Sequence, residues 1–456
     1  MFTIGLLVAG SLGGTVRMRA TELHTPNDPL FVSKQAYLAD IDAPAAWDTQ
    51  TGDPAVVVAV IDSGIDAMHP DLAVNIWQNP TPGAFGCAGD LHGCTLLDPN
   101  DAAASCSGIG PARTGDVSAL SPHGTFLAGV IGAAGDNGLG IAGVAWHVSL
   151  MAVRVSDCRD GSNAETVAAG IRYAADAGAR IAVLGLAASR GSGGGCRAPN
   201  RLLADAVQYA RDRGVLVVAP AGDSSQPCVA DPAAAPQALA VGGYQLPGRT
   251  RLRVGRGRTG SNWGPEIAIA APALDIASTI PRQAGRMPPD DLYATTYGTP
   301  FAAGIVGGAA ALLLSQNALL TPDWLTELLV LGARPLADGA APGWAGAGAI
   351  DLAASLRLVP AGFAGALTVA GEPAPDGTPV EAYVNDVLCA STTSFTQNGR
   401  ASYALLVPAA AMQAGCGSPG ATVELRVNGV SAAQASWSAA AVTLDLDGAA
   451  APGTTP

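Results

Sequence analysis

The stretch 56-VVVAVIDSGID-66 decides the fold prediction. Its first part, residues 56–61, is apolar without interruption, which is typical of a strand buried on both faces of a parallel sheet. The run ends directly in Asp62, and small residues follow. In doubly wound sheets, functional groups gather at the carboxyl ends of the strands. Asp62 is therefore a candidate for orienting and stabilising an imidazole, although a structural capping aspartate would give the same local pattern.

Three further apolar runs alternate with helical segments: LMAVRV (150–155), RIAVLGL (180–186) and VLVVA (215–219). Between the last two, 200-NRLLADAVQYARDRG-214 carries one apolar stripe at helical spacing, with Asn200 as the expected N-cap and Gly214 just beyond the expected end. This rhythm predicts an α/β domain with a doubly wound, mostly parallel sheet and helices on both faces.

The apolar run 301-FAAGIVGGAAALLL-314 is nearly long enough to cross a membrane. Its Gly and Ala content and the turn before it favour a buried core helix instead, so we expect no membrane span. The 456-residue chain has a formal net charge of −13. Nucleic-acid binding needs a basic face, so we also expect no nucleic-acid partner.

The sequence contains eight cysteines together with many Gly and Pro residues. An even cysteine count in such a chain favours disulfides and an exported protein, secreted or held at the cell surface. The cluster 87-CAGDLHGC-94 with Cys106 also suggests a metal site through His92. Its spacing fits no standard zinc pattern, so disulfides are the favoured interpretation.

A change of composition near residues 358–362 marks the end of the first domain. Beyond it, VEAYV (380–384) and VELRV (423–427) alternate apolar and polar residues between turn signals, which predicts a small C-terminal all-β sandwich over residues 364–447. We expect a disulfide between Cys389 and Cys416 to staple it. This domain is a candidate for contact with a surface or a glycan, and residues 448–456 are expected to be a flexible tail.

A second candidate site residue lies in 121-SPHGTFLAGVIGA-133, where His123 stands at an expected helix start and Gly124 allows a close approach. Further along, 298-GTPFAAG-304 has the layout of a nucleophile site, a Gly-containing turn followed by a small, apolar helix start. Alone, Asp62 and His123 each have a plain structural interpretation. Together with the later stretch, they stand in the chain order acid, base and nucleophile position.

With these residues in view, the chain resembles the subtilisin-like serine peptidases (the S8 family, or subtilases), most of all their thermitase-like branch. The resemblance covers residues 25–357 and implies a subtilisin-like fold and serine endopeptidase activity for that domain. The blocks that carry it are VIDSGID (60–66), HGTFLAG (123–129), GIAGVAWHVSLMAVRV (140–155), ETVAAGIRYAADAGA (165–179) and GTPFAA (298–303).

The resemblance assigns Asp62 as the acid and His123 as the general base. It places the nucleophilic serine at position 300 and the oxyanion asparagine at position 223, but these positions hold Pro300 and Asp223. The strand that pairs with substrate corresponds to 183-VLGLAA-188, which departs from the family's pattern at the cleft residues Gly185, Leu186 and Ala187.

These departures predict an inactive member of the family. Pro300 has no hydroxyl, so no acyl-enzyme can form there. An ionised Asp223 cannot donate a hydrogen bond to an oxyanion. Thr299 carries a neighbouring hydroxyl, but we expect it to point elsewhere. The favoured function is a pseudoprotease that binds a peptide or protein ligand; the alternatives are an active endopeptidase with a non-standard nucleophile and a structural or adhesion protein with an idle cleft.

The resemblance also implies a calcium site and a pro-region. The expected calcium ligands are the side chains of Asp28, Asp71 and Asn137 with carbonyl oxygens of Gly135, Leu139 and Ile141, an all-oxygen set of the kind that Ca²⁺ takes. Residues 1–24 are either a signal-like segment, since they begin with an apolar run, or the remnant of a pro-region.

Overall fold

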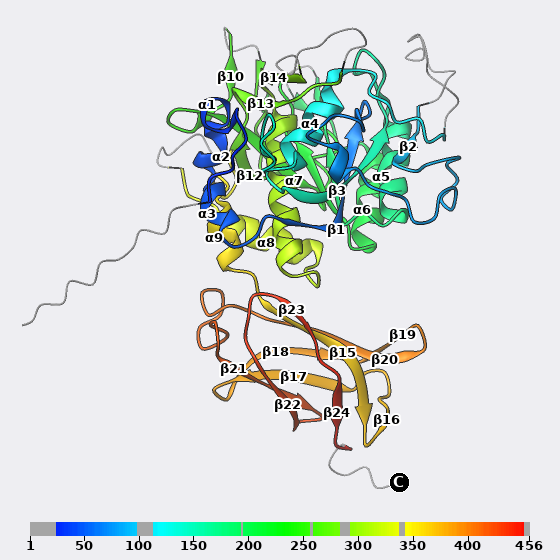
Figure 1. Ribbon diagram of the computed structural model, residues 1–456, viewed down its shortest axis with the longest axis vertical. Coiled ribbons are helices and arrows are strands. Elements are labelled where there is room, and N and C mark those ends of the chain that lie inside the picture. The colour runs from blue at the N-terminus through cyan, green and yellow to red at the C-terminus, as the bar shows by residue number, and fades with distance from the viewer. Residues whose placement is uncertain are drawn as a thin grey trace, which may run out of the picture.

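The computed structural model describes residues 24–97, 113–192, 195–255, 259–282, 292–336 and 343–450. Its first domain is built on a sheet of order β12-β8-β7-β4-β1-β3-β2, in which all these neighbours are parallel and short β9 adds an antiparallel edge (Figure 1). The strands are β1 (Gly52–Asp62), β2 (Gly93–Thr95), β3 (His147–Arg154), β4 (Ile181–Leu184), β7 (Leu216–Pro220), β8 (Leu239–Gln245), β9 (Thr250–Arg251) and β12 (Ile267–Pro272).

Helices cover both faces of this sheet, and the side chains of β1 show why. Alternate residues of a strand point to opposite faces. Val58 and Val60 enter the core that contains α4 and α7, whereas Ala59 and Ile61 enter the core that contains α5 and α6. The helices are α1 (Phe31–Lys34), α2 (Ala36–Asp40), α3 (Ala43–Trp47), α4 (Pro122–Gly132), α5 (Ala164–Asp176), α6 (Arg201–Asp212), α7 (Thr299–Gln316), α8 (Pro322–Gly332) and α9 (Leu352–Arg357), with a 3₁₀ turn η1 (Ala73–Asn75).

The loops of this domain contain three short pairs of antiparallel strands in the described residues. They are β5 (Gly191–Ser192) with β6 (Gly195–Cys196), β10 (Arg253–Val254) with β11 (Thr259–Gly260), and β13 (Ile276–Thr279) with β14 (Tyr293–Thr296).

The local predictions for this domain agree with the structure. Helix α6 begins after Asn200, whose side-chain oxygen accepts a hydrogen bond from the Leu203 amide at 3.3 Å. Helix α7 is the one described helix long and apolar enough to cross a membrane, and almost all of its residues are buried in the domain. It is a core helix, as its small residues indicated, and the predicted α/β fold class is confirmed.

The C-terminal domain consists of two antiparallel sheets around their own core. One sheet has the order β18-β17-β21-β22; the other has the order β16-β15-β20-β19, with β23 and β24 pairing in parallel with β15. The strands are β15 (Ala361–Val369), β16 (Glu372–Pro373), β17 (Pro379–Val384), β18 (Val387–Thr393), β19 (Phe395–Gln397), β20 (Arg400–Val407), β21 (Thr422–Val427), β22 (Val430–Ser436), β23 (Ala441–Thr443) and β24 (Leu446–Gly448). The predicted all-β region is therefore present.

Disulfides occur in both domains. The described pairs are Cys87–Cys94, Cys196–Cys228 and Cys389–Cys416. Cys158 is also disulfide-bonded. The predicted staple of the sandwich is thus present, and the pairing of Cys87 with Cys94 supports the disulfide interpretation over the metal site. His92 instead places its Nδ1 3.0 Å from the carbonyl oxygen of Trp77. Cys106, the segment 1–23 and the last residues of the tail, 451–456, lie outside the described residues.

Figure 1 shows that the strands of the parallel sheet run away from the C-terminal domain. Their carboxyl ends lie at the far end of the first domain, and the sandwich follows α9 at the opposite end. A ligand held by the sandwich would therefore not lie over the carboxyl ends of the strands.

Candidate active site

Asp62 and His123 form a hydrogen-bonded pair at the carboxyl end of β1. Asp62 is the last residue of the strand and is fully buried. Its Oδ2 accepts a hydrogen bond from Nδ1 of His123 at 2.8 Å, and its Oδ1 accepts one from the backbone amide of Ser63 at 2.6 Å. This arrangement fixes the imidazole so that its Nε2 is left for chemistry or binding.

The start of α4 holds His123 in this place. Ser121 is the N-cap of the helix and accepts a hydrogen bond from the His123 amide at 3.2 Å. Pro122 occupies the first helical position, where its missing N–H costs nothing. A side chain at Gly124 would collide with the carbonyl oxygen of Gly64, so only glycine lets the helix approach the β1 end this closely.

The charges around His123 keep it protonated. Burial alone would lower its pKa, but the charge and hydrogen bond of Asp62, together with the charges of Asp160 and Asp223, raise the pKa of His123 to about 9. Asp160 lies in the turn before α5 and accepts a hydrogen bond from the Ser121 hydroxyl. At neutral pH the imidazole is therefore a cation among three carboxylates.

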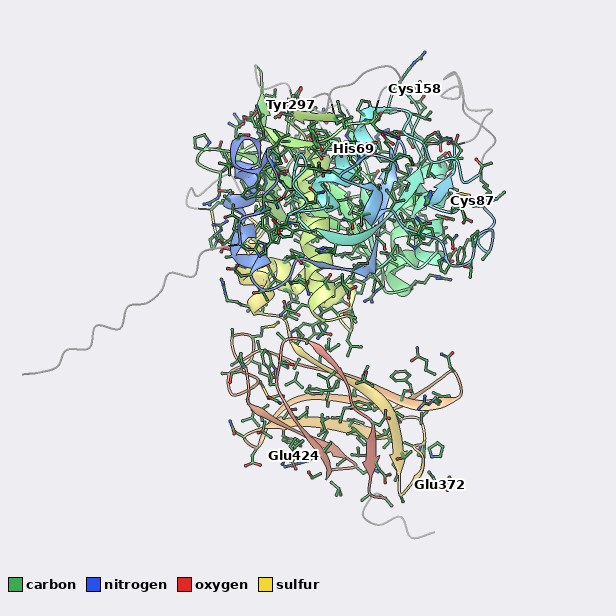
Figure 2. All side chains as sticks on the ribbon, viewed as in Figure 1. His69, Cys87, Cys158, Tyr297, Glu372 and Glu424 are labelled. Atoms are coloured by element: carbon green, nitrogen blue, oxygen red, sulfur yellow. A yellow bond between two sulfur atoms is a disulfide. The ribbon has the colours of Figure 1, made fainter. Side chains whose placement is uncertain are left out.

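Pro300 lies where the sequence placed the nucleophile, at the second residue of α7. Gly298 is the N-cap of that helix with φ of 144°, a conformation that favours glycine, and Pro300 is buried. Proline removes the hydroxyl and also the backbone N–H at this position. Figure 2 labels Tyr297, the neighbour of Gly298, at the end of the domain that lies away from the sandwich.

The carboxylate of Asp223 occupies the N-terminus of α7. Its Oδ1 and Oδ2 lie 3.0 and 3.2 Å from the amide nitrogen of Thr299, which donates to them. Gly298 supplies no side-chain cap, so Asp223 performs that role from another loop. Burial raises the pKa of Asp223, and the Thr299 bonds and the charge of His123 oppose that effect.

Thr299 carries a hydroxyl beside Pro300, but that hydroxyl is already engaged. Thr299 is fully buried, and its Oγ1 accepts a hydrogen bond from the Gly222 amide at 3.1 Å. The side chain that does approach His123 is Phe301, whose ring centroid lies 5.2 Å from the imidazole centroid.

The predicted cleft residues follow the end of β4, and they differ from one another in their surroundings. Gly185 is buried, and a side chain there would collide with Oδ2 of Asp62. Leu186 is half-buried and Ala187 is exposed. In the described part of the chain, the backbone N–H groups of Leu186 and Ala187 form no hydrogen bond, so this segment has a free edge.

Sequence reasoning did not identify Asp160 or Ser121 as part of this site. Ser121 has a recognisable signal, because Ser directly before a proline at the first helical position is a typical helix N-cap pattern. Asp160 has none: it reaches the site through the fold of a turn 39 residues away from Ser121 in sequence.

The predicted metal-binding side chains also lie together, away from His123. Asp71 accepts hydrogen bonds from Nδ2 of Asn137 at 2.9 Å and from the Ile141 amide at 3.1 Å. Asp28 is buried, and its Oδ2 accepts from the Asp136 amide at 2.7 Å. Burial and the charge of Asp71, opposed by the bond from Asp136, raise the pKa of Asp28.

This cluster fits an oxygen-binding cation. Oδ1 of Asp28 is buried without a hydrogen-bond partner, and among the described residues no donor reaches the carbonyl oxygens of Gly135, Leu139 and Ile141. The described residues hold no group of three or more His, Cys, Asp and Glu side chains suited to a metal. Any cation here would therefore be held by two carboxylates, one amide and carbonyls, a set that suits Ca²⁺.

Comparisons with known proteins agree with this geometry. The subtilase family (Peptidase S8) profile matches residues 53–348. Thermitase from Thermoactinomyces vulgaris is 33% identical over 295 residues, which are 64% of this chain and 87% of thermitase. A thermophilic serine proteinase from Bacillus sp. (strain AK1) is 32% identical over 293 residues, 64% of this chain and 60% of that protein.

Structural comparison gives the same result. A protease from Pseudoalteromonas arctica PAMC 21717 is similar with a TM-score of 0.57 and 27% identity, and the match covers 73% of this chain and 98% of that one. The family match, the extent of the relatives and the acid–histidine pair at the end of β1 lead to one conclusion: the chain belongs to the subtilase family of serine peptidases.

Proposed function

We propose that this protein is a pseudoprotease, a subtilase that binds peptide segments in its cleft without cleaving them. The observation that supports the proposal is the start of α7, where Pro300 stands at the position that the resemblance assigns to the nucleophile and the Asp223 carboxylate caps the helix. Loss of the nucleophilic serine lowers the turnover of a subtilase by about 10⁶.

Stabilisation of an oxyanion is removed by the same two residues. The transition state of acyl transfer needs N–H donors aimed at a developing negative charge, and one such donor contributes about 10²–10³ to the rate. Pro300 has no N–H, and the Thr299 N–H is already bonded to the Asp223 carboxylate. A permanent negative charge at this place would repel an oxyanion.

The histidine is also in the wrong charge state for a general base. With its pKa raised to about 9, His123 is neutral in only about 1% of molecules at pH 7. The hydroxyls described next to it belong to buried residues: Ser63 and Ser121 bond to each other at 3.0 Å, and Ser121 bonds to Asp160. These contacts argue against a replacement nucleophile at the site.

Binding is supported by what the site keeps. The segment Leu186–Ala187 presents backbone groups without partners in the described structure, and an extended peptide can pair with such an edge by strand addition. Gly185, directly before that edge, packs against Asp62, whose Oδ2 would collide with any side chain there. The structural or adhesive alternative is favoured only if no peptide binds there.

The decisive experiment exposes the purified protein to a fluorophosphonate probe and to casein, with thermitase as the positive control. We expect no labelling and no cleavage, because among the described residues the hydroxyls near His123 are buried and already hydrogen-bonded. Labelling that disappears in a Thr299→Ala variant would show that the threonine is a nucleophile and would overturn the proposal. A screen of immobilised peptides then tests binding directly, and a screen with no hits would favour the idle-cleft alternative.

We also propose that the cluster of Asp28, Asp71 and Asn137 binds Ca²⁺, supported by the unpartnered Oδ1 of Asp28 and the free carbonyls of the same loop. Tyr293 offers a direct readout, because after burial the charge of Asp71 is the largest influence that raises its pKa, so the two groups are neighbours. Terbium added to the protein should therefore luminesce on excitation of nearby aromatic rings, and Ca²⁺ should displace it. Absence of calcium-sensitive luminescence would contradict the proposed Ca²⁺ site.

Export of the protein is the third part of the proposal. Five described disulfide-bonded positions in the first domain, besides the sandwich pair, suit an oxidising compartment: Cys87, Cys94, Cys158, Cys196 and Cys228. Fractionation of cells that express the full gene, with detection by antibody, tests it, and a purely cytosolic signal would contradict it.

A further inference from the structure

A cavity of about 200 Å³ opens next to the free edge of the cleft. The segment Leu186–Ala188 forms one wall, the starts of α5 and α6 form two others, and Asp231–Pro232 closes it. Its apolar surface comes from Val167, Leu186 and Leu203. A peptide strand paired with Leu186–Ala187 would send alternate side chains towards this wall, so one of them can enter the cavity.

Two carboxylates line this cavity, together with the uncharged polar residues Ser162, Asn163 and Asn200. Asp160 stands exposed on one side, and Asp231, which is 7% exposed, stands on the other. Among the described residues that line the cavity there is no Lys, Arg or His. The Asp160 carboxylate has the Ser121 hydroxyl as its described partner, and the Asp231 carboxylate accepts one described hydrogen bond, from the Asn200 amide at 3.1 Å.

The basic residues nearest to Asp231 do not neutralise the cavity. Arg190 donates from Nε to the Arg197 carbonyl at 3.0 Å and pairs with Glu266 at 3.4 Å. Arg197 donates to the carbonyl oxygen of Ser189 at 3.0 Å. Burial raises the pKa of Asp231 above its ordinary value. The charges of Arg190 and Arg197, which lie outside the cavity lining, lower that pKa but do not cancel the effect of burial.

Two helix N-termini meet the cavity, and by themselves they would favour an anion. Each is already capped: Asn163 accepts from the Thr166 amide at 2.8 Å and Asn200 from the Leu203 amide at 3.3 Å. Full charges on two carboxylates exceed the half charges of two capped helices, so the cavity favours a cation.

Disulfides fix the walls of the cavity. Cys158 is disulfide-bonded two residues before Asp160, and Cys228, bonded to Cys196, lies three residues before Asp231. Figure 2 labels Cys158 at the same end of the domain as the start of α7. A pre-formed cavity binds a guest without first ordering its own walls, which favours affinity.

We infer that this cavity selects an arginine or lysine side chain of the bound peptide, holding the apolar stem against Val167 and Leu203 and the charged end between Asp160 and Asp231. The inference rests on the proposed peptide-binding function. An aliphatic stem under a charged head is the shape of these two side chains. The ligand class of the cleft is therefore a peptide with a basic residue.

The test uses fluorescein-labelled octapeptides of alternating Ala and Thr, with one position in turn changed to Arg, Lys, norleucine or Glu, and anisotropy titrations of the full-length protein. Norleucine has the stem of lysine without its charge. At one position we expect Arg and Lys to bind about tenfold more tightly than norleucine, the scale of one close charge pair. Glu at that position should bind most weakly.

Two variants locate the effect. Asp160→Asn and Asp231→Asn should each reduce the preference for Arg over norleucine, and together they should bring it close to one. Asp386→Asn in the sandwich makes the same change of net charge at a 97% exposed side chain and should leave the preference unchanged. Thermal melts check that each variant is folded. If Asp231→Asn does not fold, Asp160→Asn still tests the inference, because the Asp160 side chain is exposed.

The outcomes separate the two proposals. Equal binding of Arg and norleucine at every position would overturn this inference and leave peptide binding intact. A preference that survives in the double variant would place the cation elsewhere in the cleft and would also overturn it. Failure of every octapeptide to bind would contradict the proposed function itself.

Discussion

Placing a serine at position 300 is the sharpest test of the proposal that this site lacks only the groups that carry the chemistry. The variant Pro300→Ser returns both a hydroxyl and a backbone N–H to the second residue of α7. Proline is favourable in a first helical turn, so its loss should cost stability only slightly, within about 1 kcal/mol. The resemblance places this serine beside His123, whose hydrogen bond to Asp62 is already 2.8 Å long.

The expected magnitude follows from the charge of His123. A pKa of about 9 leaves about 1% of the imidazole neutral at pH 7 and about half at pH 9. Labelling of Pro300→Ser by a fluorophosphonate should therefore be slow at pH 7 and rise about fiftyfold by pH 9. The sign is fixed, because only the neutral imidazole accepts the serine proton.

Adding Asp223→Asn should change both the rate and its pH dependence. The amide supplies an oxyanion donor, which contributes about 10²–10³. Removing the Asp223 charge also lowers the pKa of His123, so the rise in rate should begin at lower pH. The assay is the rate of labelling from pH 6 to 10, read from gels after quenching, with Pro300→Ser plus His123→Gln as the unreactive control.

Two results would refute this reasoning. A labelling rate of Pro300→Ser that is flat between pH 7 and 9 would mean that His123 is already neutral and that the surrounding carboxylates do not hold its proton. A folded double variant that remains unlabelled would mean that substrate is misplaced as well, for which the departures at Gly185 and its neighbours are the first place to look.

Further predictions concern stability, measured by urea unfolding except where stated. Because the pKa of His123 is raised in the folded state, protonated His123 stabilises the fold fully below about pH 6.5, and this stabilisation is lost as pH rises through 9. Relative to His123→Gln, the free energy of unfolding of wild type should fall by at most about 3 kcal/mol over that window. Equal pH profiles of the two proteins would contradict this. Asp223→Ala should cost about 1 kcal/mol through loss of the α7 cap, and an unchanged midpoint would exclude the capping role. Gly185→Ala should cost about 1–3 kcal/mol because its side chain meets Asp62, whereas Gly195→Ala, with open space, should be neutral; similar costs would reject the collision. Chelation should lower the melting temperature of wild type, and Asp71→Ala should abolish that effect; identical melts with and without chelator would argue against the metal.

The sequence predicted the parts of this protein that local pattern controls. The apolar runs around residues 56–61 and 215–219 are central strands of the sheet, and the apolar stripe of α6 is its buried face. Both could be predicted because the spacing of apolar residues along a strand or helix follows which of its faces are buried. Asp62 could be placed at the end of a strand because the apolar run of residues 56–61 ends directly in it.

The rest depended on contacts between distant segments. From the sequence, Asp223 was expected only to fail as a donor to an oxyanion. Its hydrogen bond to Thr299, 76 residues away, is set by how the loop after β7 meets α7. Asp160 reaches Ser121 across 39 residues. The periodicity of the sequence does not indicate contacts between segments so far apart. Neither the charge state of His123 nor the acidic cavity could therefore be predicted before the fold was known.

The two changes at the start of α7 are physically consistent with each other. A helix N-terminus attracts negative charge, and in an acyl-transfer site that charge exists only transiently on the substrate. Here Asp223 provides the charge permanently and receives the Thr299 N–H, while Pro300 needs no partner for an N–H that it lacks. The same carboxylate adds to the field that keeps His123 protonated. A single exchange therefore meets a site still arranged around the other residue, which is why we expect Pro300→Ser alone to restore only slow labelling and the double exchange to restore more.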